Sequence, residues 1–151
     1  MIVTYFGTHM LTKGNRAGEI VPGFQPYRAS CSWTEFVNVL RAASEVETDP
    51  RDKIKTLSIS MADFEPGKNR GNKYALRCDW IGIDLDNKPD DQGRTDPDQW
   101  TVDRLAPWLD DQGLTYVIYT TSSCREGAEC LRLLLPLSQS VTADDWPLFW
   151  G

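Results

Sequence analysis

The sequence predicts a mixed α+β domain, in which a sheet carries flanking helices. Segments rich in β-branched and aromatic residues alternate along the chain with segments whose apolar residues recur at helical spacing. Their order is strand, helix, strand, strand, helix, strand, strand, helix, which is typical of this class. The 151 residues are enough for one core, so we expect a single domain over residues 1–151.

The N-terminal segments predict a strand, a loop and a helix. Ile2–Phe6 is typical of a short strand, and residues 13–30, rich in Gly, Pro and basic residues, are typical of a loop or irregular strand. Ser32 followed by Glu35 forms a capping-box pattern, and the apolar stripe that follows predicts a helix to about Ser44. The same patterns predict strands over 57–61, 80–85, 115–121 and 131–137, a polar loop over 63–72 and an acidic turn over 87–97.

Two further helices are predicted in the C-terminal half. Asp96 caps the first, with Pro97 at its first position, and the helix is expected to end at Gly113 with a kink or restart at Pro107. The second opens at residues 144–146, and the sequence stops about one turn later. Because so short a helix is not a natural domain end, we expect a fragment that is incomplete at its C-terminus.

Composition excludes several classes of site. The four cysteines form no CxxC pair, so we expect no structural zinc site. We expect reduced, mostly buried thiols instead. The single histidine, His9, excludes motifs that need a pair of histidines. No run of about 18 apolar residues occurs and the N-terminus lacks a signal-peptide pattern, so we expect a cytoplasmic protein with no membrane partner.

Charge is distributed unevenly along the chain. Residues 1–77 carry 11 basic and 8 acidic side chains, whereas residues 78–151 carry 5 and 14. A net charge of −6 is not typical of a nucleic-acid-binding domain, although a bound divalent ion would reverse part of the acidic field locally.

The most informative segment is the apolar run that ends in Asp84 and Asp86. Residues i and i+2 of a strand point to the same face, so the two carboxylates are expected to project side by side. Two carboxylates this close repel unless a cation or a proton intervenes. Oxygen ligands suit Mg²⁺ or Mn²⁺, which usually act together with substrate phosphates. The alternative is that Asp and Asn residues only form the turn after the strand.

Three segments together resemble the archaeo-eukaryotic primase superfamily (primase-polymerases), in the form found in phage and plasmid replication proteins. Residues 32–36 resemble the helix start upstream of the catalytic strand, and residues 81–86 look like its Asp-x-Asp motif. Residues 119–124 and 131–138 resemble a strand with a Thr/Ser-rich turn and an Arg-bearing strand that ends in Pro-Leu-Ser. The resemblance extends from about residue 30 to the end of the chain.

This resemblance implies a primase-polymerase-like sheet with flanking helices, possibly truncated, in a single catalytic domain over residues 1–151. It also implies metal-dependent nucleotidyl transfer in DNA replication priming, with two metal ions assisting the reaction. Asp84 and Asp86 would be the catalytic, metal-holding residues, with Mg²⁺ or Mn²⁺ as cofactor. The nucleotide-binding residues would be Ser122, Ser123, Cys124 and Arg132, the last through its guanidinium. The implied partners are nucleotide triphosphates, a single-stranded DNA template and a fused or separate helicase.

The chain departs from the family pattern in two places. The Thr/Ser-rich turn normally ends in a histidine near the position of Cys124, and a thiol cannot supply its positive charge; Arg125 is the adjacent candidate to replace it. The family also needs a further carboxylate on a later strand. Asp144 and Asp145 are interpreted as helix caps instead, so the chain is expected to hold half of an active site.

Two other functions and several structural interpretations stay open. The chain could be a non-catalytic nucleic-acid-binding remnant of the fold, or a metal-dependent phosphoesterase or nuclease. Arg132 could form a structural salt bridge, Ser122 and Ser123 could be ordinary turn residues, and the tryptophans are expected mainly in the core. Candidates for DNA contact, or for a solvated surface, are Lys55, Lys68, Arg70 and Lys73.

Overall fold

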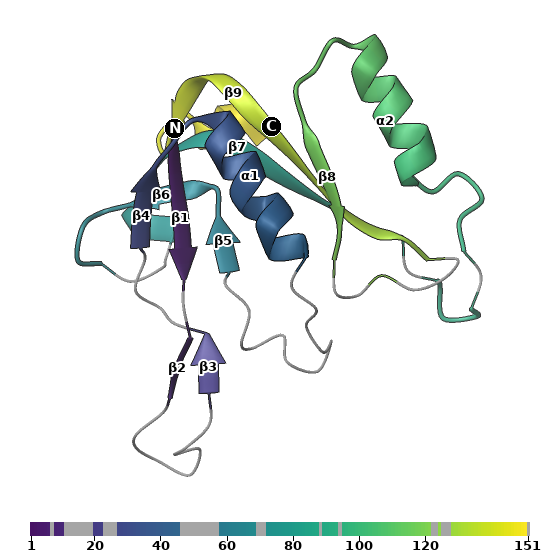
Figure 1. Cartoon of the computed structure of the whole chain (residues 1–151), viewed down its shortest axis with the longest axis horizontal. Coiled ribbons are helices and arrows are strands. Elements are labelled where there is room, and N and C mark those ends of the chain that lie inside the picture. Colours follow the sequence, from purple (N-terminus) through teal and green to yellow (C-terminus); the bar gives the residue numbers. More distant parts are fainter. Residues whose placement is uncertain are drawn as a thin grey trace. The chain divides into compact units, whose positions relative to one another are not determined.

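The computed structural model has the predicted mixed α+β class (Figure 1). It describes residues 1–6, 8–10, 20–22, 27–45, 58–68, 72–87, 89–93, 95–121, 124 and 128–150. The strands are β1 (Ile2–Phe6), β2 (Thr8–Met10), β3 (Ile20–Pro22), β4 (Tyr27–Ser30), β5 (Ser58–Ser60), β6 (Ala62–Phe64), β7 (Ala75–Asp86), β8 (Val117–Thr120) and β9 (Cys130–Thr142). The helices are α1 (Trp33–Ser44), α2 (Val102–Asp111) and α3 (Trp146–Trp150), with a 3-10 turn, η2 (Asn72–Tyr74).

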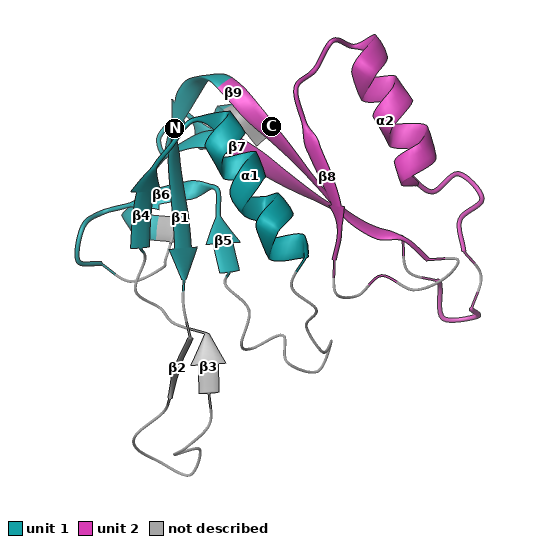
Figure 2. Cartoon of the chain, in the orientation of Figure 1, with its two compact units in different colours: residues 1–79, 138–151 teal, residues 80–137 magenta. Residues whose placement is uncertain are grey.

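The chain forms two compact units (Figure 2). The first comprises residues 1–79 and 138–151, and the second comprises residues 80–137. The strands form a sheet in the order β4-β1-β5, a pair β2-β3, and a sheet in the order β6-β7-β9-β8. Strands β7 and β9 are long enough to contribute residues to both units. None of the helices in the described part of the chain is long and apolar enough to cross a membrane.

The first unit is built around strand β1. It pairs antiparallel with β4 and with β5, so that Ile2 lies opposite Ser30 and Thr4 lies opposite Ser60. Phe6 is 1% exposed and meets Phe64 edge-to-face with ring centroids 6.0 Å apart. Val3 and Thr4 are both buried although neighbouring residues of a strand point to opposite faces, so β1 is covered on both of its faces.

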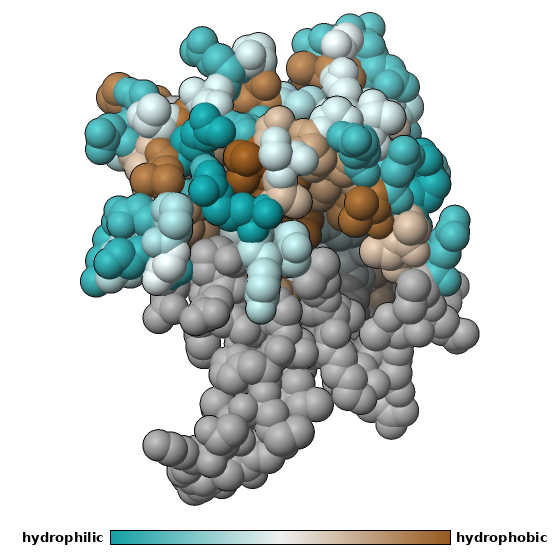
Figure 3. Space-filling view, turned by 60° about the vertical axis from the view of Figure 1, so that its left-hand side comes forward, coloured by the Kyte–Doolittle hydropathy of each residue, from teal (hydrophilic) through white to brown (hydrophobic). Residues whose placement is uncertain are grey.

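Helix α1 begins and ends where the sequence predicts. The Ser32 hydroxyl accepts a hydrogen bond from the Glu35 backbone N–H, and the Glu35 carboxylate accepts one from the Ser32 N–H in return. The expected apolar stripe is less buried than its pattern suggests, because Phe36 is buried whereas Val39 is 60% exposed. The face drawn in Figure 3 likewise mixes apolar and hydrophilic residues, as protein surfaces commonly do.

Charged side chains hold the first unit together. Asp63 is buried and receives the Arg28 guanidinium at 2.6 Å and 2.7 Å. Asp79 accepts hydrogen bonds from the Ile2 backbone N–H at 2.5 Å and from the Ser140 hydroxyl at 2.6 Å. Arg77 lies between the two carboxylates, 3.8 Å from Asp63 and 3.6 Å from Asp79. A buried carboxylate needs such partners to remain charged.

The second unit packs helix α2 on one face of its strands. Leu105 and Leu109 of α2 form a buried cluster with Leu133 of β9, and Ile83, Leu85, Tyr116, Ile118 and Leu135 pack against it. Helix α2 then ends at a glycine, as predicted: Gly113 has φ of +64°, a conformation that other residues rarely adopt. Pro107 lies inside the helix, which continues through it.

Several predicted boundaries are wrong. Helix α2 begins after Thr101 rather than at Asp96, because the Asp96 carboxylate accepts from the Asp98 N–H and closes a separate turn. Residues 62–64 form strand β6, which overlaps the start of the polar loop predicted over 63–72. Residues 20–22 and 27–30 form short strands, which agrees with the second of the two alternatives for residues 13–30, a loop or an irregular strand. Strands β7 and β9 extend beyond the apolar runs that predicted them, because their outer residues pair with neighbouring strands.

We predict that Leu109→Ala lowers the free energy of unfolding by about 2–5 kcal/mol, because it removes a side chain that is 1% exposed and leaves a cavity. Urea unfolding followed by circular dichroism measures the change. Leu148→Ala is the matched control, because that leucine is 84% exposed and its loss should change stability by at most about 0.5 kcal/mol. Equal effects of the two substitutions would contradict the packing described here.

We also predict that Asp79 stabilises the fold at neutral pH and loses this effect in acid. Burial alone raises the pKa of the carboxyl group, but the hydrogen bonds from Ser140 and Ile2 and the nearby Arg77 together lower that pKa. The unfolded chain therefore binds the proton more readily, and stability falls as the pH drops below about 4. Urea unfolding across pH 2–7 should show Asp79→Asn less stable than wild type at pH 7, with the gap closing in acid. Asp144→Asn, an exposed control, should leave the profile unchanged.

Candidate functional site

The candidate site lies on the face of the second unit that is turned away from helix α2. Along β7, Ile83 and Leu85 pack toward α2, so Asp84 and Asp86 project to the opposite face. Along β9, Leu133 packs toward α2, so Cys130 and Arg132 project to the opposite face as well. The alternation that the sequence predicts for the two carboxylates is thus present, and it brings Arg132 to the same side.

Asp84 and Arg132 form a bidentate ion pair. The Nε atom of Arg132 lies 2.5 Å from Oδ1 of Asp84, and its Nη2 atom lies 3.1 Å from Oδ2. The hydrogen bonding to Asp84 raises the pKa of the Arg132 guanidinium, although partial burial acts in the opposite direction. The Asp84 side chain is 62% exposed. The structural interpretation of Arg132 as a salt-bridge partner is therefore confirmed, in a position that solvent can reach.

Tyr119 of β8 contacts the arginine of this ion pair. It lies directly opposite Arg132 in the antiparallel pairing of β8 with β9. Its hydroxyl is 3.4 Å from Nη1 of Arg132, and its ring centroid is 6.0 Å from the guanidinium carbon. A guanidinium over an aromatic face is favourable, so Tyr119 helps to fix the direction of the Arg132 side chain.

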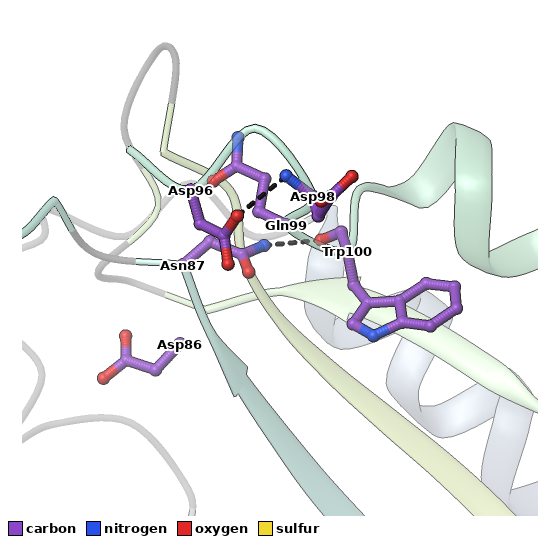
Figure 4. Close-up of a pocket in the computed structure, with 6 residues that line it drawn as sticks. All are labelled: Asp86, Asn87, Asp96, Asp98, Gln99 and Trp100. Carbon is purple, nitrogen blue, oxygen red and sulfur yellow. Dashed lines mark hydrogen bonds between the residues drawn. The ribbon is translucent and has the colours of Figure 1, made fainter. Parts of the chain in front are cut away.

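Asp86 has a different environment from Asp84. Its Oδ1 atom lies 3.2 Å from the buried Cys130 thiol, which acts as the donor. Asp86 also lines a pocket of about 380 Å³ together with Asn87, Asp96, Asp98, Gln99 and Trp100 (Figure 4). In Figure 4 the Asp86 side chain lies apart from those of Asp98 and Trp100. The two carboxylates of the motif therefore have separate partners.

Asn87 fixes the end of β7. Its side-chain nitrogen donates to the Trp100 carbonyl at 2.5 Å and to the Glu129 carbonyl at 2.6 Å. The Glu129 carboxylate accepts from the Val102 backbone N–H at 3.0 Å. Sequence analysis treated Asn87 as a turn residue, but it ties the segment before α2 and the segment before β9 to the strand that carries the carboxylates.

The residues of this face have the donor chemistry that a hard divalent ion prefers. Asp84 and Asp86 supply carboxylate oxygens, and each oxygen has lone pairs beyond the one that accepts a hydrogen bond. Among the residues that the structure describes, no three His, Cys, Asp or Glu side chains lie together in a metal-binding arrangement. A metal ion here would accordingly take its remaining ligands from phosphate and water, as Mg²⁺ commonly does.

The other predicted site residues are only partly placed. Ser122, Ser123, Lys55 and Arg70 lie outside the described residues. Cys124 follows β8, and its backbone N–H donates to the Thr121 carbonyl at 3.0 Å. All four cysteines are free thiols, with Cys78 and Cys130 buried; burial raises the pKa of Cys78 to about 11.

Lys68 and Lys73 belong to the first unit and flank one tyrosine. Their ammonium groups lie 5.6 Å and 4.8 Å from the centroid of the Tyr74 ring. Both lysines are exposed. Both lysines remain candidates for contact with a phosphate backbone. Their cation–π contacts with Tyr74 also give each lysine a structural role.

Sequence reasoning missed Tyr119 and Cys130 as neighbours of the motif. Cys130 is two residues before Arg132, so the same period-two rule that pairs the carboxylates could have placed it on this face. Tyr119 required the register of β8 on β9, which a single sequence does not supply.

Comparisons with known protein families, with curated proteins and with solved structures found no match to this chain. The resemblance to primase-polymerases therefore rests on the three sequence segments alone.

We predict that the Asp84–Arg132 pair contributes little to stability. Both side chains are partly exposed, so a double-mutant cycle of Asp84→Ala and Arg132→Ala should give a coupling energy of about 0.5–1 kcal/mol. Urea unfolding of the two single variants, the double variant and wild type measures it. A coupling several times larger would mean that the pair is a structural element of the fold, and that its loss cannot be used to test function.

Proposed function

We propose that the face formed by Asp84, Asp86 and Arg132 binds a nucleotide triphosphate together with Mg²⁺ or Mn²⁺, for nucleotidyl transfer in DNA replication priming. The observation that supports this most directly is the placement of two carboxylates and one guanidinium on adjacent strands, on one face. Carboxylates complement the metal, and a guanidinium complements the phosphates. Metal ions bound here would neutralise the charge of the triphosphate and activate the attacking hydroxyl.

Arg132 has the geometry to exchange one anion for another. A phosphate group offers the same two-oxygen fork that Asp84 presents now, at 2.5 Å and 3.1 Å. When a phosphate accepts from the guanidinium, both Asp84 oxygens are released for a cation. Tyr119 holds the guanidinium beside its ring during this exchange, which keeps the arginine directed toward the same side of the sheet.

The remaining partners in the proposal follow from the family resemblance. A single-stranded DNA template would supply the sequence to be copied, and Lys68 and Lys73 are exposed cations available for its phosphates. Lys55, Arg70, Ser122 and Ser123 belong to the same proposal by their sequence positions. A fused or separate helicase would unwind the template, and the reaction would take place in the cytoplasm.

A second candidate function is a non-catalytic nucleic-acid-binding module. The observation that favours it is the ion pair itself, because Arg132 already neutralises Asp84. In addition, no third carboxylate joins Asp84 and Asp86 among the described residues. This function would need neither metal nor an ionised Asp84.

The prediction that tests the leading proposal is metal-dependent nucleotide binding. Wild-type protein should bind ATP or dATP in the presence of Mn²⁺, and Asp84→Asn/Asp86→Asn should weaken that binding at least about tenfold because the cation loses both protein carboxylates. Isothermal titration calorimetry measures it. Asp90→Asn/Asp91→Asn is the matched control: it removes the same charge from the exposed turn after β7 and should keep the affinity.

Other outcomes separate the alternatives. If neither protein binds nucleotide, or if the control variant loses as much affinity as the site variant, the leading proposal is wrong. Binding of single-stranded DNA in EDTA that survives Asp84→Asn would establish the non-catalytic module instead. Mn²⁺-dependent cleavage of DNA without nucleotide triphosphates would point to a phosphoesterase or nuclease.

A further inference from the structure

An exposed aromatic cluster lies at helix α2 and the segment that leads into it. The cluster consists of Trp100, before the helix, and Arg104 and Trp108 of the helix. The two indoles are 40% and 49% exposed, with ring centroids 6.0 Å apart and planes inclined by 54°. The Arg104 guanidinium carbon lies 5.8 Å from the Trp100 ring centroid. The expectation that the tryptophans lie mainly in the core is therefore wrong for these two.

The exposure of this cluster follows from the helix period. Leu105 and Leu109 occupy the buried side of α2, at 4% and 1% exposure. Arg104 and Trp108 are four residues apart and share another side, next to Trp100 in the segment that leads into the helix. Two large indoles held in solvent expose apolar surface that folding did not bury, and such surface commonly marks an interaction site.

The surroundings of the cluster are strongly acidic. Residues 95–111, all described, contain five aspartates and one arginine. Arg104 is itself engaged, because it lies 3.8 Å from Asp98 and donates to the Gln99 carbonyl at 3.0 Å. The charge left uncompensated is therefore negative. The pocket of about 380 Å³ includes Asp96, Asp98 and Trp100, and in Figure 4 the Trp100 indole extends away from the two carboxylates, toward the outside of the pocket.

This combination selects the chemistry of the partner. Carboxylates at this density repel the phosphates of a nucleic acid, which rules against base stacking on the tryptophans. An indole face and nearby carboxylates together favour a cation, and a guanidinium most of all, because it stacks on the ring while it donates to the oxygens. Arg104 over Trp100 already forms such a contact within the chain.

We propose that the cluster of Trp100, Arg104 and Trp108, with its adjoining acidic pocket, docks a basic, arginine-containing segment of a partner protein. The docked arginines stack on the indoles and pair with Asp96, Asp98 and the aspartates of α2. Arg104 and Trp108 belong to α2, whose buried leucines pack on the face of the strands opposite Asp84. The adjoining pocket shares Asp86 with the proposed nucleotide site, so the test variants are confined to the two tryptophans.

The test uses a fluorescein-labelled octapeptide of alternating arginine and alanine, titrated with the full chain in a fluorescence anisotropy assay. Wild type should bind with a Kd in the range of about 1–100 μM. Trp100→Ala/Trp108→Ala should weaken binding at least about tenfold, whereas Trp100→Phe/Trp108→Phe, which keeps aromatic faces, should stay within about threefold. The corresponding lysine peptide should bind more weakly than the arginine peptide.

Control variants separate docking from general charge attraction and from misfolding. Val39→Ala/Leu148→Ala removes two exposed apolar side chains elsewhere and should leave the affinity unchanged. Circular dichroism confirms that each variant keeps the wild-type fold. The proposal is overturned if the wild type does not bind the arginine peptide, if the double alanine variant binds it equally well, or if labelled single-stranded DNA binds this cluster instead. It is also overturned if wild type elutes as a dimer in size-exclusion chromatography and Trp100→Ala/Trp108→Ala elutes as a monomer, because a second copy of the chain would then cover the tryptophans.

Discussion

Strand β7 can bury only every second side chain beneath α2, and this constraint determines where the polar residues of the second unit go. Ile83 and Leu85 pack with Leu105 and Leu109, which directs Asp84 and Asp86 to the other face. Strand β9 obeys the same rule, so Arg132 meets Asp84 as a consequence of Leu133 being buried. The ion pair, the tyrosine beside it and the proposed nucleotide site all depend on this one alternation.

The two faces of the second unit differ in the charge that they offer a ligand. On the Asp84 face, the Arg132 guanidinium pairs with one carboxylate and has the geometry to pair with a phosphate instead. On the α2 side, Arg104 is held by Asp98 and by backbone carbonyls, and the surrounding aspartates are left over. One face therefore suits an anion bound with a cation, and the other suits a cation alone. The acidic excess of residues 78–151 thus serves two different surfaces.

Sequence patterns predict the elements of this fold better than their ends. The capping box at Ser32 and the glycine after α2 fix helix termini through contacts among neighbouring residues, so both were predicted correctly. The start of α2 was not predicted correctly, because an aspartate can cap a helix or close a turn, and Asp96 accepts from the Asp98 N–H and closes a turn. A salt bridge from Arg132 to a nearby acid was foreseen as one of two possibilities, but its partner, Asp84, was not. Tyr119 depends on strand register, which a single sequence does not contain.

The exposure of Asp84 has a consequence for how this chain can change over evolutionary time. A side chain that is 62% exposed and lies opposite the core can be replaced without disturbing the leucines under α2. Selection on chemistry and selection on folding therefore act on different residues of the same strand. A lineage without use for the proposed nucleotide site could lose either carboxylate and keep a stable protein, and a lineage that kept the fold could regain the pair by two substitutions.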